Sequence, residues 1–191
     1  VSDEGLPLLN RAISAQEPPG STFKTIVAAA ALDAGAINRY TRYVSSAGYT
    51  FSNGSPFQEY QGHVYGSLNL IDAISVSSNI YFCEVIRHWN MDELVPYIEK
   101  FGIGELTGID LQGEMLGRVP SPENKEALAN TTSPWLDPIW YPEGDSCNSV
   151  IGQGITLVTP IQMANWMAAI ANGGTLNTPH VAEKFVSSEG V

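Results

Sequence analysis

The sequence has few basic residues, few cysteines and no long apolar run. Nine Lys and Arg residues stand against twenty Asp and Glu, giving a net charge of −11, and no basic run interrupts this deficit. We therefore expect no nucleic-acid partner, because nucleic acids are bound by basic surfaces. No apolar stretch reaches the roughly 18 residues of a membrane span, and no charged-then-apolar leader opens the sequence. The chain is expected to be a soluble piece.

The supply of metal-binding side chains is equally small. Cys83 and Cys147 are the two cysteines, too few for a disulfide scaffold and without the spacing of a zinc site. His63, His88 and His180 are scattered, with no carboxylate or cysteine at ligand spacing. We expect no metal and no cofactor. The apolar run around Cys83 is typical of a small core residue, and a Cys83–Cys147 bridge is the alternative that the sequence leaves open without favouring it.

The 191 residues and 43% hydrophobic content fit one globular unit with a core. Apolar residues at helical spacing predict a buried helix over 21–34, ended by Gly35, and further helices over about 92–100 and 159–171. "LNLIDAI" and "IYFCEVIRHW" predict two helices separated by Ser77-Ser78-Asn79. Asn53-Gly54 predicts a β-hairpin within 43–65. We expect an ordered loop over 113–148 and few strands after residue 66.

The stretch "EPPGSTFK" places Ser21 and Lys24 three residues apart at the start of the alanine-rich helix. On a helix, such positions share a face with Cβ atoms about 5–6 Å apart. A serine hydroxyl becomes a nucleophile beside a base, and an unprotonated lysine can serve as one. Lowering a lysine pKa to near 7 takes about 3 units, or ~4 kcal/mol, which burial supplies. The pattern predicts acyl transfer through Ser21.

The stretch from Ser21 to Lys24 also has a purely structural interpretation. A serine after Pro-Pro-Gly is a normal helix N-cap, and S-x-x-K occurs by chance. The second stretch, Ser77-Ser78-Asn79, changes this balance, since it interrupts two apolar helices with polar groups. A cap at Ser78 or Asn79 leaves Ser77 free to point toward a site.

With these motifs the chain resembles the transpeptidase domain of class B penicillin-binding proteins, a family whose S-x-x-K, S-x-N and K-T-G set is a known pattern. The resemblance extends over "LLNRAISAQEPPGSTFK", "GHVYGSLNLIDAISVSSNIYF", "FGIGELTGIDLQGE" and "GDSCNSVIGQGITLVTPIQMANWMAAIANGG". "TGIDLQGEMLGRVPSPENK" and "WYPEGDS" look closer to cell-elongation enzymes. The resemblance implies an α/β (α+β) fold of the β-lactamase/transpeptidase type.

The resemblance also implies roles for four residues. Ser21 would be the acylated nucleophile, Lys24 its base, Ser77 a proton relay, and Asn79 a ligand for the substrate amide that orients Lys24. The implied reaction crosslinks peptidoglycan stem peptides, with β-lactams as inhibitors that esterify Ser21. Wall-synthesis membrane proteins would be partners of the parent protein. It would act at the extracytoplasmic face of the bacterial membrane, anchored by an N-terminal segment absent here.

One family motif is missing. The lysines that follow Ser77 give "KFG", "KEA" and "KFV", so no K-[ST]-G strand is present in residues 1–191. In relatives that motif supplies an oxyanion donor and comes after the "ANGG" block, together with the last strands of the central sheet. Losing one such donor typically costs a factor of 10²–10³ in rate. We therefore expect residues 1–191 to be a helix-rich partial domain, with little or no turnover alone.

Two other functions remain open from the sequence. A serine β-lactamase or β-lactam sensor shares the S-x-x-K chemistry, but no residue is a clear activator of a deacylating water. A catalytically silent scaffold in the wall-synthesis complex fits the missing third motif, but would not need Ser21, Lys24, Ser77 and Asn79 together. The lifetime of a penicilloyl adduct separates the first of these from a transpeptidase.

Overall fold

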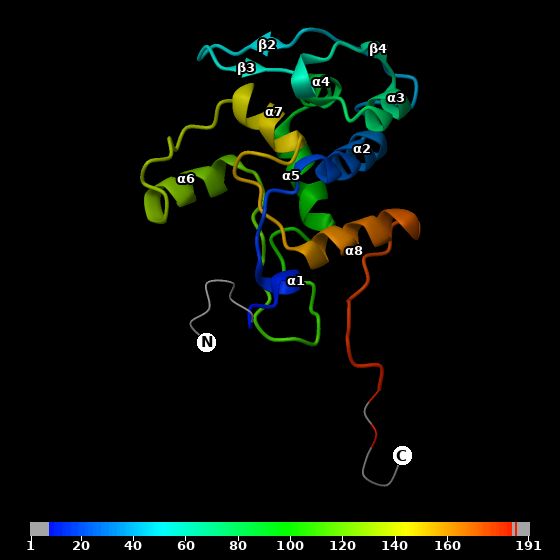
Figure 1. The fold of residues 1–191 in the computed structure, drawn as a ribbon, viewed down its shortest axis with the longest axis vertical. Coiled ribbons are helices and arrows are strands. Elements are labelled where there is room, and N and C mark those ends of the chain that lie inside the picture. Colours follow the sequence, from blue (N-terminus) through cyan, green and yellow to red (C-terminus); the bar gives the residue numbers. More distant parts are fainter. Residues whose placement is uncertain (1–7, 185, 187–191) are drawn as a thin grey trace.

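The structure is a computed structural model that describes residues 8–184 and residue 186. Helices are its main secondary structure, and the short strands lie together at one end of its longest axis (Figure 1). The helices are α1 (Arg11–Ser14), η1 (Gly20–Phe23), α2 (Lys24–Asp33), η2 (Tyr60–Gly62), α3 (Leu70–Ser75), α4 (Asn79–His88), α5 (Met91–Lys100), α6 (Pro122–Thr131), α7 (Gly144–Val150) and α8 (Pro160–Ala171). The strands are β1 (Tyr43–Ser45), β2 (Tyr49–Thr50), β3 (Pro56–Phe57) and β4 (Gly66–Leu68).

The core is built around α2 and α4. Helix α2 packs against α5 and α8, while α4 packs against α7 and β1. The small alanines of α2 let neighbouring helices approach closely, and Ile26 and Val27 fill the space between them. Trp166 of α8 is fully buried and meets Phe23 edge-on, with ring centroids 6.4 Å apart. The segment that carries Ser21 and Lys24 therefore packs on a well-filled core.

Most predicted helices are confirmed, and one predicted loop is wrong. Helices α3, α4, α5 and α8 form where their apolar periodicity places them, and Thr159 caps α8 with the predicted proline at its first turn. The segment 113–148, expected to be a loop, contains α6 and the start of α7. Ser121 caps α6 and Pro122 occupies its first turn, a start signal that outweighs the polar composition of "ENKEALAN".

The sheets are small and antiparallel. β1 pairs with β4, with Tyr43 opposite Leu68, and β2 pairs with β3, with Tyr49 opposite Phe57. The second pair is the predicted hairpin, although residues 51–55 form its loop rather than Asn53-Gly54 alone. Within residues 8–184 no strand follows β4, and isolated bridges join residues 17 and 118 to the segment 157–158. The fold is thus the expected helix-rich mixture of helix and sheet.

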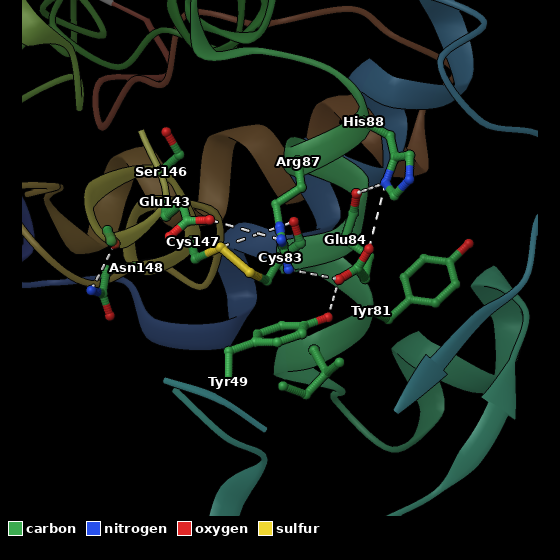
Figure 2. Close-up of a disulfide and its surroundings, with 12 residues drawn as sticks. Tyr49, Tyr81, Cys83, Glu84, Arg87, His88, Glu143, Ser146, Cys147 and Asn148 are labelled. Atoms are coloured by element: carbon green, nitrogen blue, oxygen red, sulfur yellow. Dashed lines mark hydrogen bonds and ion pairs between the residues drawn. A yellow bond between two sulfur atoms is a disulfide. The ribbon is translucent and has the colours of Figure 1, made fainter. Parts of the chain in front are cut away.

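A disulfide links Cys83 of α4 to Cys147 of α7, which settles the alternative that the sequence left open (Figure 2). Both cysteines are fully buried. Near the bridge, Glu84 accepts hydrogen bonds from the Tyr49 hydroxyl and the Arg87 guanidinium. The bond therefore fastens the helix that follows Ser77 to the helix that leads toward residue 152.

Reduction of this bridge is expected to destabilise the fold. The cysteines are 64 residues apart in sequence, and closing a loop of that length lowers the entropy of the unfolded chain by an amount equivalent to about 4 kcal/mol. Urea unfolding with and without dithiothreitol measures the difference. The Cys83→Ala/Cys147→Ala double variant is the control, since its unfolding midpoint should be low and insensitive to the reductant. Equal midpoints for the oxidised and reduced wild type would contradict the prediction.

Among the described residues, no helix combines the length and apolar character needed to cross a bilayer.

Candidate active site

Ser21 lies on a tight turn rather than on the α-helix that the sequence predicted. Gly20–Phe23 form a 3₁₀ helix, η1, and the α-helix begins at Lys24. Residues i and i+3 eclipse one another on a 3₁₀ turn, so Ser21 and Lys24 still lie on one side. The Gly20 N–H donates to the carbonyl of Gly152 at 2.9 Å. Ser21 is therefore held at an exposed position between α2 and the loop that follows α7.

Lys24 is a buried amine with three acceptors. Its side chain is 3% exposed, and Nζ donates to the Ser77 carbonyl at 2.6 Å, Ser77 Oγ at 3.1 Å and Asn79 Oδ1 at 2.8 Å. Burial lowers the pKa of Lys24 to about 8, while the negative charge of Glu59 acts in the opposite direction. At neutral pH an appreciable minority of this amine is consequently unprotonated, as a general base requires.

Ser77 and Asn79 face Lys24 because of the backbone between α3 and α4. Ser77 has a positive φ of 56°, a left-handed conformation that is uncommon for a residue other than glycine. Its carbonyl and its hydroxyl both reach Lys24. Ser78, which is fully buried, caps α4 by accepting from the Tyr81 N–H. The cap fixes the backbone and leaves Ser77 to the site, as the sequence suggested.

The hydroxyl of Ser21 makes no hydrogen bond to any described residue, so Lys24 is bonded to Ser77 and Asn79 but not to Ser21. The structure thus brings together three of the four predicted residues by direct contact and places the fourth beside them. Hydrogen bonds of catalytic groups are often long in ligand-free structures and tighten with substrate.

Three residues of the site, Ser21, Ser77 and Asn79, all line one cavity of about 510 Å³. A larger one of about 770 Å³, between α5 and residues 116–119, contains none of the four residues. Among the described residues, no cluster of three or more His, Cys, Asp or Glu side chains is arranged to hold a metal. The smaller cavity is lined by, among others, Ser21, Ser77, Asn79, Glu59, Tyr60 and His63.

Sequence reasoning missed two features of the site. Glu59 is 2% exposed and hydrogen-bonds the turn that carries Ser77 and Asn79. It is the single acidic residue between Asp33 and Asp72, a signal that was available in the sequence. The close approach of Gly20 and Gly152 was not predictable in this way, because the two glycines are far apart in the chain.

Residues 2–189 match the family model described as "Penicillin binding protein transpeptidase domain". The chain belongs to this penicillin-binding protein transpeptidase family. The peptidoglycan D,D-transpeptidase MrdA of Escherichia coli K12 is 32% identical over 182 residues, which cover 95% of this chain and 28% of the relative. The chain therefore spans little more than a quarter of the length of that curated relative.

Solved penicillin-binding proteins have the same fold. The Helicobacter pylori PBP2, determined in complex with MreC, matches with a TM-score of 0.82 and 32% identity, over 93% of this chain and 32% of that one. Pseudomonas aeruginosa PBP2, determined in complex with WCK 5153, matches with a TM-score of 0.81 and 33% identity, over 93% and 39% respectively. The expected fold and family, including the likeness to the elongation-type proteins, are thereby confirmed.

Proposed function

We propose that this chain carries the nucleophile and base of a serine-type D-Ala-D-Ala transpeptidase that crosslinks peptidoglycan stem peptides. One observation supports this most directly: a buried Lys24 amine with a pKa lowered to about 8 contacts Ser77 and Asn79 beside the exposed Ser21. A buried lysine with a purely structural role would gain from an anionic partner in direct contact. Here all three acceptors are uncharged oxygens.

In the first step, Ser21 Oγ attacks the carbonyl carbon of the penultimate D-Ala of a stem peptide. Its proton passes to Lys24 Nζ, which the Asn79 side chain keeps oriented toward the site. The peptide bond then breaks, and the amine of the terminal D-Ala receives a proton through the Ser77 hydroxyl, which hydrogen-bonds to Lys24. The products are an ester on Ser21 and free D-Ala.

In the second step, an amine from a neighbouring strand attacks the ester carbonyl. The amine loses its proton to the Ser77 and Lys24 pair, and the ester bond to Ser21 Oγ breaks as the oxygen takes a proton back. The exposure of Ser21 and Ser77 on one cavity leaves space for the acceptor strand to approach. A β-lactam enters only the first step and stays bound as an ester.

We further propose that residues 1–191 form the part of the transpeptidase domain with the first two motifs, and that a K-[ST]-G segment from outside this range completes the site. Oxyanion donors on that segment would stabilise the tetrahedral intermediate. The 191-residue chain alone is then expected to turn over slowly or not at all.

The location and partner of the parent protein follow from the same proposal. The substrate lies outside the cytoplasm, and a buried disulfide such as Cys83–Cys147 persists in oxidising compartments. We therefore place the parent protein at the extracytoplasmic face of the membrane. Because the similar Helicobacter pylori protein was determined with MreC, a wall-synthesis membrane protein is the partner that we propose.

The test is the mass of the full-length protein after incubation with benzylpenicillin. We expect a penicilloyl adduct on Ser21 that lasts for hours, together with D-Ala release from a D-Ala-D-Ala peptide. The Ser21→Ala variant should gain no mass and is the control. An adduct that is hydrolysed within seconds would instead indicate a β-lactamase. A folded full-length protein that never gains the mass at Ser21 would indicate a silent scaffold.

A further inference from the structure

Glu59 is a buried carboxylate in the proposed site that has no role in the two-step reaction. It immediately precedes η2 and is 2% exposed. Its Oε1 accepts hydrogen bonds from the hydroxyls of Ser45 at 2.8 Å and Ser78 at 2.5 Å, and from the Ile80 N–H at 3.3 Å. Its Oε2 accepts from the Asn79 N–H at 2.5 Å. Both oxygens are thus used, and all four partners donate.

Three of these four donors belong to the start of α4, within three residues of Ser77. The unpaired N–H groups at a helix start favour an anion there, because the peptide dipoles point their positive end toward it. Ser77 itself has a left-handed backbone, which persists only where the surroundings hold it. The carboxylate binds the two residues that follow Ser77 and so fixes the turn from which its carbonyl and hydroxyl reach Lys24.

We propose that Glu59 is a positioning residue for the acyl-transfer site, where its charge holds the Ser77–Asn79 turn in place and acts through space on the Lys24 amine. This inference rests on the proposed role of Lys24 as the base. The negative charge of Glu59 raises the pKa of Lys24 and so moderates the lowering caused by burial. Glu59 therefore acts on the base without touching the substrate.

The surroundings of Lys24 leave Glu59 as its main electrostatic neighbour. The ring of Phe82 lies 6.0 Å from Nζ and carries no charge. Tyr60, His63 and Tyr65 line the same cavity as Glu59, and among the described residues Glu59 is the charged group that acts on the pKa of Lys24. The two carboxylate oxygens of Glu59 accept from different donors. A glutamine has only one acceptor oxygen, so it would leave an N–H of α4 without an acceptor.

The experiment is an NMR titration of the lysine side chains in the full-length protein. The Lys24→Arg variant removes, and thereby assigns, the Lys24 signal. In the wild type we expect this amine to titrate at about 8. In Glu59→Gln its pKa should fall by roughly one unit, because an opposite charge has been removed. Glu59→Asp, which keeps the charge, should restore most of that shift.

Glu84→Gln is the matched control. Like Glu59, Glu84 is a poorly exposed carboxylate, but it lies on α4 and accepts hydrogen bonds from a hydroxyl and a guanidinium. It should leave the Lys24 titration unchanged. An unchanged Lys24 pKa in folded Glu59→Gln, or an equal shift in both variants, would overturn the inference. Where Glu59→Gln does not fold, Glu59→Asp decides in its place: because it keeps the charge, its Lys24 pKa should stay close to the wild-type value, and a fall of roughly one unit would refute the proposal.

This titration requires neither a β-lactam nor turnover. It can therefore succeed when no adduct forms on Ser21, and it can fail when the adduct does form. The two proposals are separable for that reason.

Discussion

Replacing Lys24 with alanine is expected to lower the second-order rate of acylation of the full-length protein by benzylpenicillin about 10³-fold. A positioned general base typically contributes 10²–10⁴ in rate, and Lys24 is the amine nearest the motif residues. Its loss also leaves the Ser77 carbonyl and the Asn79 amide oxygen without their donor. Stopped-flow measurement with a fluorescent penicillin gives the rate directly.

Two variants separate the loss of the base from the loss of a positive charge. Lys24→Arg retains a cation that does not deprotonate in proteins, so it should be nearly as slow as Lys24→Ala. Lys100→Ala, which removes a lysine on α5 that contacts Tyr97, should acylate at the wild-type rate. Fast acylation by Lys24→Arg would show that the charge, and not proton transfer, is what the site needs.

The acylation rate and the free energy of unfolding should both increase as the pH rises. Burial lowers the pKa of Lys24 to about 8, so the neutral amine becomes dominant as the pH rises through that value. The acylation rate should therefore increase from pH 6 to pH 9 with a midpoint near 8. The free energy of unfolding should increase above the same pH, because the unfolded lysine binds its proton up to about 10.4 and the folded one does not.

The sequence was informative where a local pattern carries the structure. Apolar spacing placed α4, α5 and α8, and a short polar interruption marked the turn at Ser77. The position of Ser21 and Lys24 at one helix start was also local, although the first turn is 3₁₀ rather than α. Motif spacing thus indicated which side chains to bring together but gave no distances.

The features that the sequence left open or missed depend mostly on contacts between distant segments. The Cys83–Cys147 bond joins helices separated by 64 residues, and no local pattern reports such a pairing. Glu59 comes from a hairpin region and reaches the start of α4 through a fold that must already exist. Helix α6 was overlooked for a different reason, since a polar composition hid the cap at Ser121.

Gly152→Ala is expected to slow acylation about 10²-fold, although residue 152 has no functional group. An added Cβ would lie 2.0 Å from the carbonyl oxygen of Gly20 and 2.6 Å from its nitrogen, and residue 152 also has a φ of +72°. Neither of these neighbours is a side chain that could rotate away. The turn before Ser21 must therefore move, and a misplacement of about 1 Å can cost about 10²-fold in rate.

Gly154→Ala is the control that isolates this clash from backbone strain. Residue 154 has a similar φ of +70°, but its added Cβ would meet Asn148 and Ser149 only at 3.8 and 4.0 Å. It should therefore lose about 1–2 kcal/mol of stability through the left-handed backbone and keep its acylation rate. Gly152→Ala should lose more stability, at least ~3 kcal/mol, along with acylation. Equal behaviour of the two variants would show that the Gly20–Gly152 contact does not position Ser21.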